Sequence, residues 1–475
     1  MKYIPEKQYR CTIIRGKSQN DMEDMLPLYA DIVHRNCPCT KAEFVERAQK
    51  RLSKALFATE AYSLLSKANR KTVDNHLTEI AGTLLGLYYY EQDNSTKLDI
   101  AYESESCKYI VDKEDNPAFF KNLCLNFQFP NAAKWKEYVE KDIENKVRIR
   151  PFCYVVKLLY YAQNHPQKAL LTKQEIGYYV LNNLQVLQGI IPPETVYHRI
   201  MDDRKNKIKR EKLSGSYDWQ HIKEQFNLLE LANIIETDAT YLWLNKNESN
   251  AVKIFIEHLD KEMFEVDSFL IDTPKGWKVF ESEWRKYYGR FNRELETINT
   301  QFNSDIVLIG RNEQVAQSGV TESSVDIGDD GEALVYRLEQ ERVRNYKERL
   351  VNKVLLLGKT KGLGYDISSI EANENPRRPE FARYIEVKAT KRVTEPSFNK
   401  EWLDSLNITA KEWVAAEQYG EYYNIYRVYF TKSKTIIVRI QNPYQRYKDE
   451  EIEVYPTIYQ MNFGTNVIEK RYEGE

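Results

Sequence analysis

The chain has 475 residues, which is enough for several domains with separate cores, and its 42% hydrophobic and 29% charged residues exclude a disordered or fibrous protein. Its 69 Lys and Arg residues nearly balance 71 Asp and Glu residues, which excludes a uniformly basic coating protein but leaves local basic patches open. No stretch approaches the roughly 18 apolar residues of a membrane span, so we expect a cytosolic protein.

The first 145 residues are predicted to form a helical module that ends in a small hairpin. Residues 41–68 carry apolar side chains close to a 3.6-residue period, and a second helix follows with Asn69 as its N-cap. Residues 87–90 and 97–102 are typical of two strands around a polar turn. This order is that of a winged helix-turn-helix, whose second helix would expose four side chains suited to phosphates and base edges: Arg70, Lys71, Asn75 and His76.

The same pattern recurs in residues 146–300. Thr172 is expected to cap a helix, and residues 228–235 with 240–244 would form a second wing. Between these elements lies a basic run, residues 199–212, with seven basic and three acidic side chains. One interpretation is a DNA-facing surface made by Arg204, Lys205, Lys207, Lys209 and Arg210. The other is a solvated charged helix, which is the common fate of such runs.

A change in composition separates these modules from the C-terminal part. Residues 301–330 are rich in Ser, Gly, Asn and Asp, which predicts a linker, although residues 306–309 are apolar. Residues 331–475 combine one helix with strands that alternate in polarity, which predicts an α/β domain. Asp366 lies at one strand, and Glu386 and Lys388 lie two residues apart on the next, so the last two share a face. We expect the three groups to meet at one edge of a sheet.

Two carboxylates and an ammonium group suit metal-assisted phosphodiester hydrolysis. Asp366 and Glu386 would provide oxygen ligands to Mg²⁺, which activates water and neutralises charge on the phosphate. Lys388 would orient or help deprotonate that water, or stabilise the transition state as a fixed charge. A further acid could come from the preceding helix, where Glu332 and Glu339 lie on one face. The bare motif is weakly specific, since a solvent-facing ion pair has the same pattern.

Longer blocks of sequence around these residues are more informative. Their order and spacing resemble the NO VEIN C-terminal domain family over residues 328–432, a family similar to the PD-(D/E)xK nucleases. The blocks are Gly364-Tyr365-Asp366-Ile367-Ser368-Ser369, Arg383-Tyr384-Ile385-Glu386-Val387-Lys388-Ala389-Thr390, Thr409-Ala410-Lys411-Glu412-Trp413-Val414-Ala415-Ala416 and Tyr423-Asn424-Ile425-Tyr426-Arg427-Val428. The resemblance implies an α/β restriction-endonuclease-like fold with a mixed central sheet.

The resemblance also implies roles for individual residues. Asp366 and Glu386 are the implied metal ligands, and Lys388 is the implied catalytic lysine. Glu332, in the helix start Gly331-Glu332, is favoured over Glu339 as the helix acid. Glu412 falls in the Thr-x-x-Glu-Trp block, where an orienting contact and a catalytic role both stay open.

The chain departs from the family pattern at one turn, and its N-terminal part has a looser resemblance to a second family. A polar turn at residues 371–379 contains Arg377 and Arg378, which form either a surface elaboration or a phosphate-contacting loop. The N-terminal part is loosely similar to the winged-helix recognition domains of type IIS restriction and nicking endonucleases. The matching segments are Thr72-Val73-Asp74-Asn75-His76, Arg148-Ile149-Arg150-Pro151-Phe152 and Leu171-Thr172-Lys173-Gln174-Glu175-Ile176.

The sequence therefore predicts a Mg²⁺-dependent restriction-type endodeoxyribonuclease of the bacterial cytoplasm, with a role in phage defence. Mainly α-helical, tandem winged-helix-like modules would bind double-stranded DNA, and a C-terminal PD-(D/E)xK domain would cut it. Cutting both strands would require a homodimer or a second nuclease subunit, and a cognate methyltransferase is a further expected partner. The alternatives are a DNA-binding defence or regulatory protein with an inactive nuclease fold, and a nuclease that acts on RNA or modified DNA.

Overall fold

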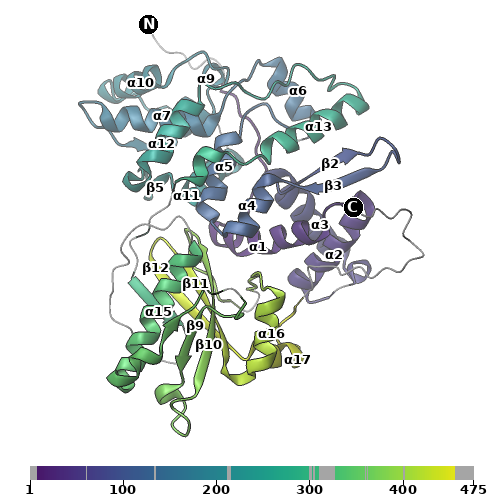
Figure 1. Ribbon diagram of the computed structural model, residues 1–475. Coiled ribbons are helices and arrows are strands. Elements are labelled where there is room, and N and C mark those ends of the chain that lie inside the picture. The colour runs from purple at the N-terminus through teal and green to yellow at the C-terminus, as the bar shows by residue number, and fades with distance from the viewer. Residues whose placement is uncertain are drawn as a thin grey trace, which may run out of the picture.

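The computed structural model describes residues 8–454, except for residues 60, 133–134, 211–215, 299–301, 303–304, 310–326, 359, 361 and 400–401. These residues form an N-terminal part, residues 8–298, which is mainly helical, and a C-terminal domain, residues 305–454, which is built on one six-stranded sheet (Figure 1). Within these residues no helix is long and apolar enough to cross a membrane.

The first half of the N-terminal part has the element order of a winged helix. It contains α1 (Gln19–Asn36), β1 (Cys39–Thr40), α2 (Lys41–Phe57), η1 (Tyr62–Leu64), α3 (Lys67–Asn75), η2 (His76–Leu84), β2 (Tyr88–Gln92) and β3 (Asp99–Glu103). The three strands form a sheet in the order β1-β3-β2, so the expected hairpin is confirmed. The single helix expected over residues 41–68 is wrong, because Ala58 is left-handed with φ 53°. Ser66, and not Asn69, caps α3.

The second half repeats this sheet order. It contains β4 (Leu171–Thr172), α8 (Lys173–Ile176), η3 (Gly177–Leu181), α9 (Leu184–Leu187), α10 (Pro193–Lys205), α11 (Ser216–Leu231), β5 (Ile235–Thr237) and β6 (Tyr241–Leu244), with sheet order β4-β6-β5. Thr172 caps α8 as predicted, in a capping box with Glu175. The strand expected over residues 228–235 is wrong, because buried Leu228, Leu231 and Ala232 follow the spacing of a helix.

One hydrophobic core runs through the whole N-terminal part. The remaining elements there are α4 (Glu105–Lys113), α5 (Asn116–Asn126), α6 (Lys136–Glu144), α7 (Pro151–Asn164), η4 (Lys246–Glu248), α12 (Ser249–His258), α13 (Pro274–Tyr288) and α14 (Arg293–Glu296). All eleven residues of α5 are buried. The buried apolar side chains between Cys11 and Leu295 form one cluster, so the two winged-helix-like halves share a core. The domain boundary expected after residue 145 stays a prediction.

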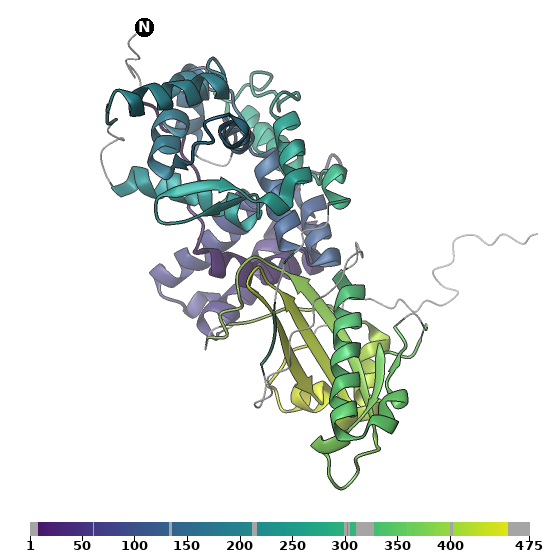
Figure 2. The same ribbon diagram turned by 90° about the vertical axis from the view of Figure 1, so that its left-hand side faces the viewer.

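The C-terminal domain is a mixed sheet with helices on both faces. It contains β7 (Asp305–Ile309), α15 (Ile327–Tyr346), η5 (Glu348–Lys353), β8 (Leu355–Leu356), β9 (Ile367–Ile370), η6 (Ala372–Glu374), β10 (Ala382–Lys391), α16 (Ala410–Tyr419), η7 (Gly420–Tyr422), β11 (Tyr423–Phe430), β12 (Lys434–Gln441) and α17 (Pro443–Lys448). The strand order is β7-β12-β11-β10-β9-β8, with β10 parallel to β11. Helix α15 runs along one face (Figure 2), and α16 packs against Tyr423 and Ile425 on the other.

The segment expected to be a linker contributes a strand to this sheet. Strand β7 lies inside residues 301–330 and pairs in parallel with β12. Its apolar sequence explains this, because such a run is stabilised as a strand when a neighbouring edge is available. Helix α15 begins at Ile327, and residues 310–326 of the expected linker lie outside the described residues. The C-terminal domain therefore starts before residue 331.

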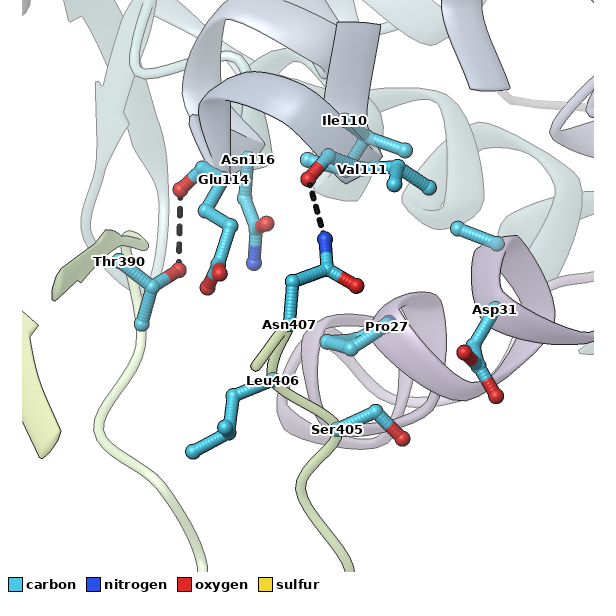
Figure 3. A pocket seen from close by; sticks show the side chains of 11 residues that line it. Pro27, Asp31, Ile110, Val111, Glu114, Asn116, Thr390, Ser405, Leu406 and Asn407 are labelled. Atoms are coloured by element: carbon cyan, nitrogen blue, oxygen red, sulfur yellow. Dashed lines mark hydrogen bonds between the residues drawn. The ribbon is translucent and has the colours of Figure 1, made fainter. Parts of the chain in front are cut away.

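The C-terminal end of β10 contacts the N-terminal part. The Lys391 backbone N–H and the Thr390 hydroxyl each donate to the Glu114 carbonyl oxygen at 2.9 Å. Figure 3 shows the Thr390 contact and a second one, in which the Asn407 side chain donates to the Val111 carbonyl oxygen at 3.1 Å. A cavity of about 30 Å³ lies between these elements. It has room for little more than a water molecule, so it is a packing gap and not a ligand pocket.

Candidate active site

Glu386 and Lys388 lie on the same face of β10, as their spacing predicts. Ile385 and Val387 point the opposite way and are buried against α15. Lys388 Nζ lies 2.7 Å from Glu386 Oε1, which places the two charged groups in direct contact. The two-residue period of a strand is sufficient to explain this arrangement.

Backbone hydrogen bonds bring Asp366 to the same place. Asp366 immediately precedes β9, and its N–H donates to the Ile385 carbonyl oxygen at 2.9 Å. Its Oδ2 accepts a hydrogen bond from the Val387 N–H at 2.8 Å. The side chain also shares a hydrogen bond with Glu386. The structure therefore brings together the side chains of Asp366, Glu386 and Lys388. The first and the last of these lie 22 positions apart along the chain.

A glycine allows the Asp366 loop to pack against α16. Gly364 has a φ of 76°, and a Cβ there would lie 2.6 Å from the Lys411 carbonyl oxygen. A larger residue would be strained at this φ and would push the loop away from the helix. The first turn of α16 carries Glu412, whose Oε2 lies 2.9 Å from Lys388 Nζ. The centre thus contains three carboxylates around one ammonium group.

The environment of these groups changes their protonation. Their side chains are largely buried, with exposed fractions of 5% for Glu386 and 18% for Lys388. Burial raises the pKa of Glu386 to about 8, and it also raises the pKa of Asp366. Burial alone would lower the pKa of Lys388, but the adjacent carboxylates of Glu386 and Glu412 raise it above its ordinary value. The Lys388 ammonium group is therefore stabilised by the two carboxylates that it contacts.

The donor set fits a hard divalent cation. Two close carboxylates that resist ionising together are stabilised when a cation takes the place of the shared proton. Mg²⁺ binds in phosphoryl-transfer sites through one or two carboxylates and completes its coordination with water and phosphate. In the part of the chain that the structure describes, no group of three or more His, Cys, Asp or Glu side chains is arranged as a metal site. Asp366 and Glu386 bring two carboxylates together, which is the kind of pair that Mg²⁺ binds, and a metal ion at this position stays a prediction.

The two candidate helix acids occupy different positions. The Glu339 carboxylate is fully buried, where it binds Arg342 at 2.6 Å and accepts from the Tyr426 hydroxyl at 2.9 Å. The Glu332 carboxylate lies beside Gly358, where a methyl group would collide with it. Gly358 follows Leu357, whose N–H donates to the Asp366 carbonyl oxygen at 2.6 Å. Glu332 therefore lies beside the segment that is hydrogen-bonded to Asp366, and its catalytic role stays a prediction.

The expected DNA-facing helix of the first module presents only part of its predicted surface. Arg70 and Lys71 are exposed and Asn75 is half-buried. The expectation that His76 is exposed is wrong, because its side chain is buried and its Nδ1 lies 2.7 Å from the Tyr29 hydroxyl. Burial lowers the pKa of His76 to about 4. The reason is tertiary, since the η2 turn that begins at this residue packs against α1.

The basic run of the second module divides into paired and unpaired side chains. Arg204 binds Glu175 through two bonds of 2.6 and 2.7 Å, and Arg210 binds Asp203 at 2.6 Å. These contacts hold α10 and the segment after it, and a DNA contact by either arginine stays a prediction. Three lysines of the run are exposed, namely Lys205, Lys207 and Lys209.

Arg377 and Arg378 are exposed on the turn between β9 and β10. That turn lies at the end of the hairpin opposite to the N-terminal part (Figure 1). The structure therefore does not bring these arginines together with the exposed lysines of the basic run, and a phosphate contact by either arginine stays a prediction.

Arg427 is a buried residue next to the centre to which sequence reasoning assigned no role. It pairs with Lys388 in the register of β10 and β11, and its side chain is only 2% exposed. It binds Asp404 at 2.7 Å and Glu114 of the N-terminal part at 2.6 Å. No signal in the sequence indicates these partners, because they lie on separate loops. For Glu412, in contrast, the pattern Thr409-x-x-Glu412 signals a capping box.

Comparisons with known proteins relate both parts of the chain to known families. Residues 3–285, more than half of the chain, match the family model described as the N-terminal domain of restriction endonuclease BpuJI. Residues 331–440 match the one described as the C-terminal domain of protein NO VEIN. Both resemblances expected from the sequence are confirmed. No curated protein matches the chain.

A solved structure supports the first match. It is described as a crystal structure of pyrene- and phenanthrene-modified DNA in complex with the BpuJ1 endonuclease binding domain. It superposes on this chain with a TM-score of 0.54 and 38% sequence identity, and the match covers 61% of this chain and all of that one. At this identity the likeness extends beyond fold to sequence.

Proposed function

The chain belongs to the family of the restriction endonuclease BpuJI N-terminal domain, and from this premise we propose that it is a restriction-type DNA endonuclease. The N-terminal part would recognise double-stranded DNA, and the C-terminal domain would be a PD-(D/E)xK nuclease. The observation that carries the proposal is the convergence of Asp366, Glu386 and Lys388 on one side of β10. The bound DNA in the similar solved structure supports the recognition role. Acting on DNA would place the protein in the cytoplasm.

In this mechanism some side chains would bind the metal ion, and another would stabilise the charge that develops on the phosphate. When bound, Mg²⁺ would neutralise charge on the phosphate. It would also lower the pKa of water, so that water can act as the nucleophile at neutral pH. Asp366, oriented by the Val387 N–H, and Glu386 would hold that ion. Lys388 would donate hydrogen bonds to the scissile phosphate and stabilise the charge that develops on it. A role for Lys388 in orienting the attacking water or helping to deprotonate it stays a prediction.

The exposed basic side chains are the proposed DNA contacts. Arg70 and Lys71 would contact phosphates from the first module, and Lys205, Lys207 and Lys209 from the second. Such contacts give affinity and position without reading sequence. Cleavage of both strands would need two centres, which a homodimer or a second nuclease subunit would supply. A cognate methyltransferase would protect the DNA of the cell.

A cleavage assay tests the proposal. Supercoiled plasmid, phage DNA, modified DNA and RNA are incubated with the full chain in Mg²⁺ or in EDTA. We expect Mg²⁺-dependent products on DNA from the wild type and none from Asp366→Asn or Lys388→Ala. Lys448→Ala, an exposed lysine on α17, is the matched control and should cleave normally.

Three outcomes would change the conclusion. Equal cleavage by the wild type and by both variants would show that the reaction takes place elsewhere. DNA binding without cleavage on every substrate would favour a DNA-binding protein with an inactive nuclease fold. Cleavage restricted to RNA or to modified DNA would change the substrate class but keep the site.

A further inference from the structure

The ammonium group of Lys388 is held by two carboxylates from different elements. Glu386 Oε1 on β10 lies 2.7 Å away, and Glu412 Oε2 at the start of α16 lies 2.9 Å away. Such charge-assisted contacts are short and directional, so together they define where the ammonium group sits. When the centre binds a cation, the position of the ammonium group depends on which of these two contacts persists.

The Glu386 carboxylate would have two cationic partners at once. It is the proposed ligand of a divalent cation with Asp366, and it is also the partner of Lys388. A divalent cation at Glu386 would repel the Lys388 ammonium, since like charges at close range in a buried site are unfavourable. Lys388 therefore needs a second anchor that does not ligate the cation.

Glu412 has the properties of that anchor. The Thr409 backbone N–H donates to Glu412 Oε2 at 2.9 Å, and the Glu412 N–H donates to Thr409 Oγ1 at 3.3 Å. This capping box fixes the carboxylate, and a negative charge at a helix N-terminus is stabilised by the helix dipole. The oxygen that contacts Lys388 is the one that caps the helix, so its position does not depend on the occupancy of Asp366 and Glu386.

Resting on the proposed function of this site, we propose that Glu412 is a positioning residue that holds the Lys388 ammonium group in place when Asp366 and Glu386 bind the cation. Glu412 acts through Lys388 and does not ligate the ion. The N-terminal turn of α16 is therefore part of the catalytic centre and not only a packing element.

The test uses Glu412→Gln in the full-length chain. A glutamine at this position of a capping box still accepts from the Thr409 N–H but removes the charge beside Lys388. Three measurements are made: Mg²⁺ affinity by calorimetry, single-turnover DNA cleavage, and acylation of the Lys388 amine by acetic anhydride, read by peptide mass spectrometry with and without Mg²⁺. The matched control is Glu43→Gln, the same change in the capping box of α2.

We expect Glu412→Gln to lower the cleavage rate about 10- to 100-fold, the order of loss caused by a misplaced catalytic group. The KM for DNA and the Mg²⁺ affinity should stay unchanged. Added Mg²⁺ should speed acylation of Lys388 in the variant but not in the wild type or in the control.

Each contrary result overturns a distinct claim. Loss of Mg²⁺ affinity in Glu412→Gln would make this residue a ligand and not an anchor. Equal acylation of Lys388 in the variant and the wild type in Mg²⁺ would show that Glu412 only caps the helix. A wild type that cleaves nothing would refute the proposed function, while the acylation result would still decide the role of Glu412.

Discussion

The buried imidazole of His76 makes the stability of the N-terminal part depend on pH. Its pKa in the folded protein is lowered to about 4, against an ordinary value of 6.5. A folded-state pKa below the unfolded value means that the contribution to stability is complete above pH 6.5 and is lost as the pH falls towards 4. Each pH unit in that window is worth about 1.36 kcal/mol. The full loss is therefore about 3 kcal/mol, of which about 2 kcal/mol is reached at pH 5.

The perturbation is His76→Asn, which places a side-chain oxygen near the position of Nδ1 and can keep a bond to the Tyr29 hydroxyl. At pH 7.5 the variant should be less stable, by about 1–3 kcal/mol, because the smaller side chain leaves unfilled volume. At pH 5 the difference from the wild type should shrink by about 2 kcal/mol, since asparagine has no proton to bind. Urea unfolding followed by circular dichroism at the two pH values measures both quantities.

A matched histidine provides the control. His34 is that control, because its hydrogen bond to Glu103 raises its pKa, although burial of the imidazole acts in the opposite direction. The stabilisation from this pair is present below pH 6.5 and is lost as the pH rises, so His34→Asn should widen the difference from the wild type in acid. If His76→Asn shows the same difference at both pH values, the imidazole titrates freely and the burial argument fails. If that variant folds normally but loses DNA affinity, His76 faces DNA after all.

Three further results are expected. Mg²⁺ binding at pH 7 should release a proton, because the pKa of Glu386 is raised to about 8, and calorimetry in buffers of different ionisation enthalpy should detect it in the wild type but not in Glu386→Gln. Replacing Lys205, Lys207 and Lys209 together by alanine should weaken DNA binding and reduce the slope of log K against log salt by about 0.9 for each lost phosphate contact; an unchanged slope would remove this surface from the interface. Arg427→Met should destabilise the protein by about 3–5 kcal/mol in thermal or urea unfolding, because it leaves two carboxylates without their buried cation, and a smaller loss would mean that they are hydrated.

Features that depend on local spacing could be predicted from the sequence. The two-residue period of a strand was sufficient to place Glu386 and Lys388 on one face. The helix cap at Thr172 and the first-module wing strands were also predicted correctly, because capping and turn chemistry act over a few residues. The local sequence also placed Asp366 at the start of a neighbouring strand, and in the structure it lies immediately before β9.

Contacts between distant segments decided the rest. His76 looked like a surface residue of a recognition helix, but the η2 turn packs against α1 and buries it. Arg204 binds Glu175, 29 residues away, a contact that its basic run does not indicate. The apolar run that became β7 had no local sign of its partner, since β12 begins more than a hundred residues later.

In the candidate centre, too, some features follow from the local sequence and others only from contacts between distant segments. The sequence by itself determined which groups are available for the chemistry, because residue type and local spacing are properties of a short segment. Only the tertiary structure decided that Glu412 contacts Lys388 and that Glu339 is occupied by Arg342, since these pairings are made by helices and strands that meet only in the folded chain. Burial at those meeting points then changes the protonation of the side chains, which no linear pattern records.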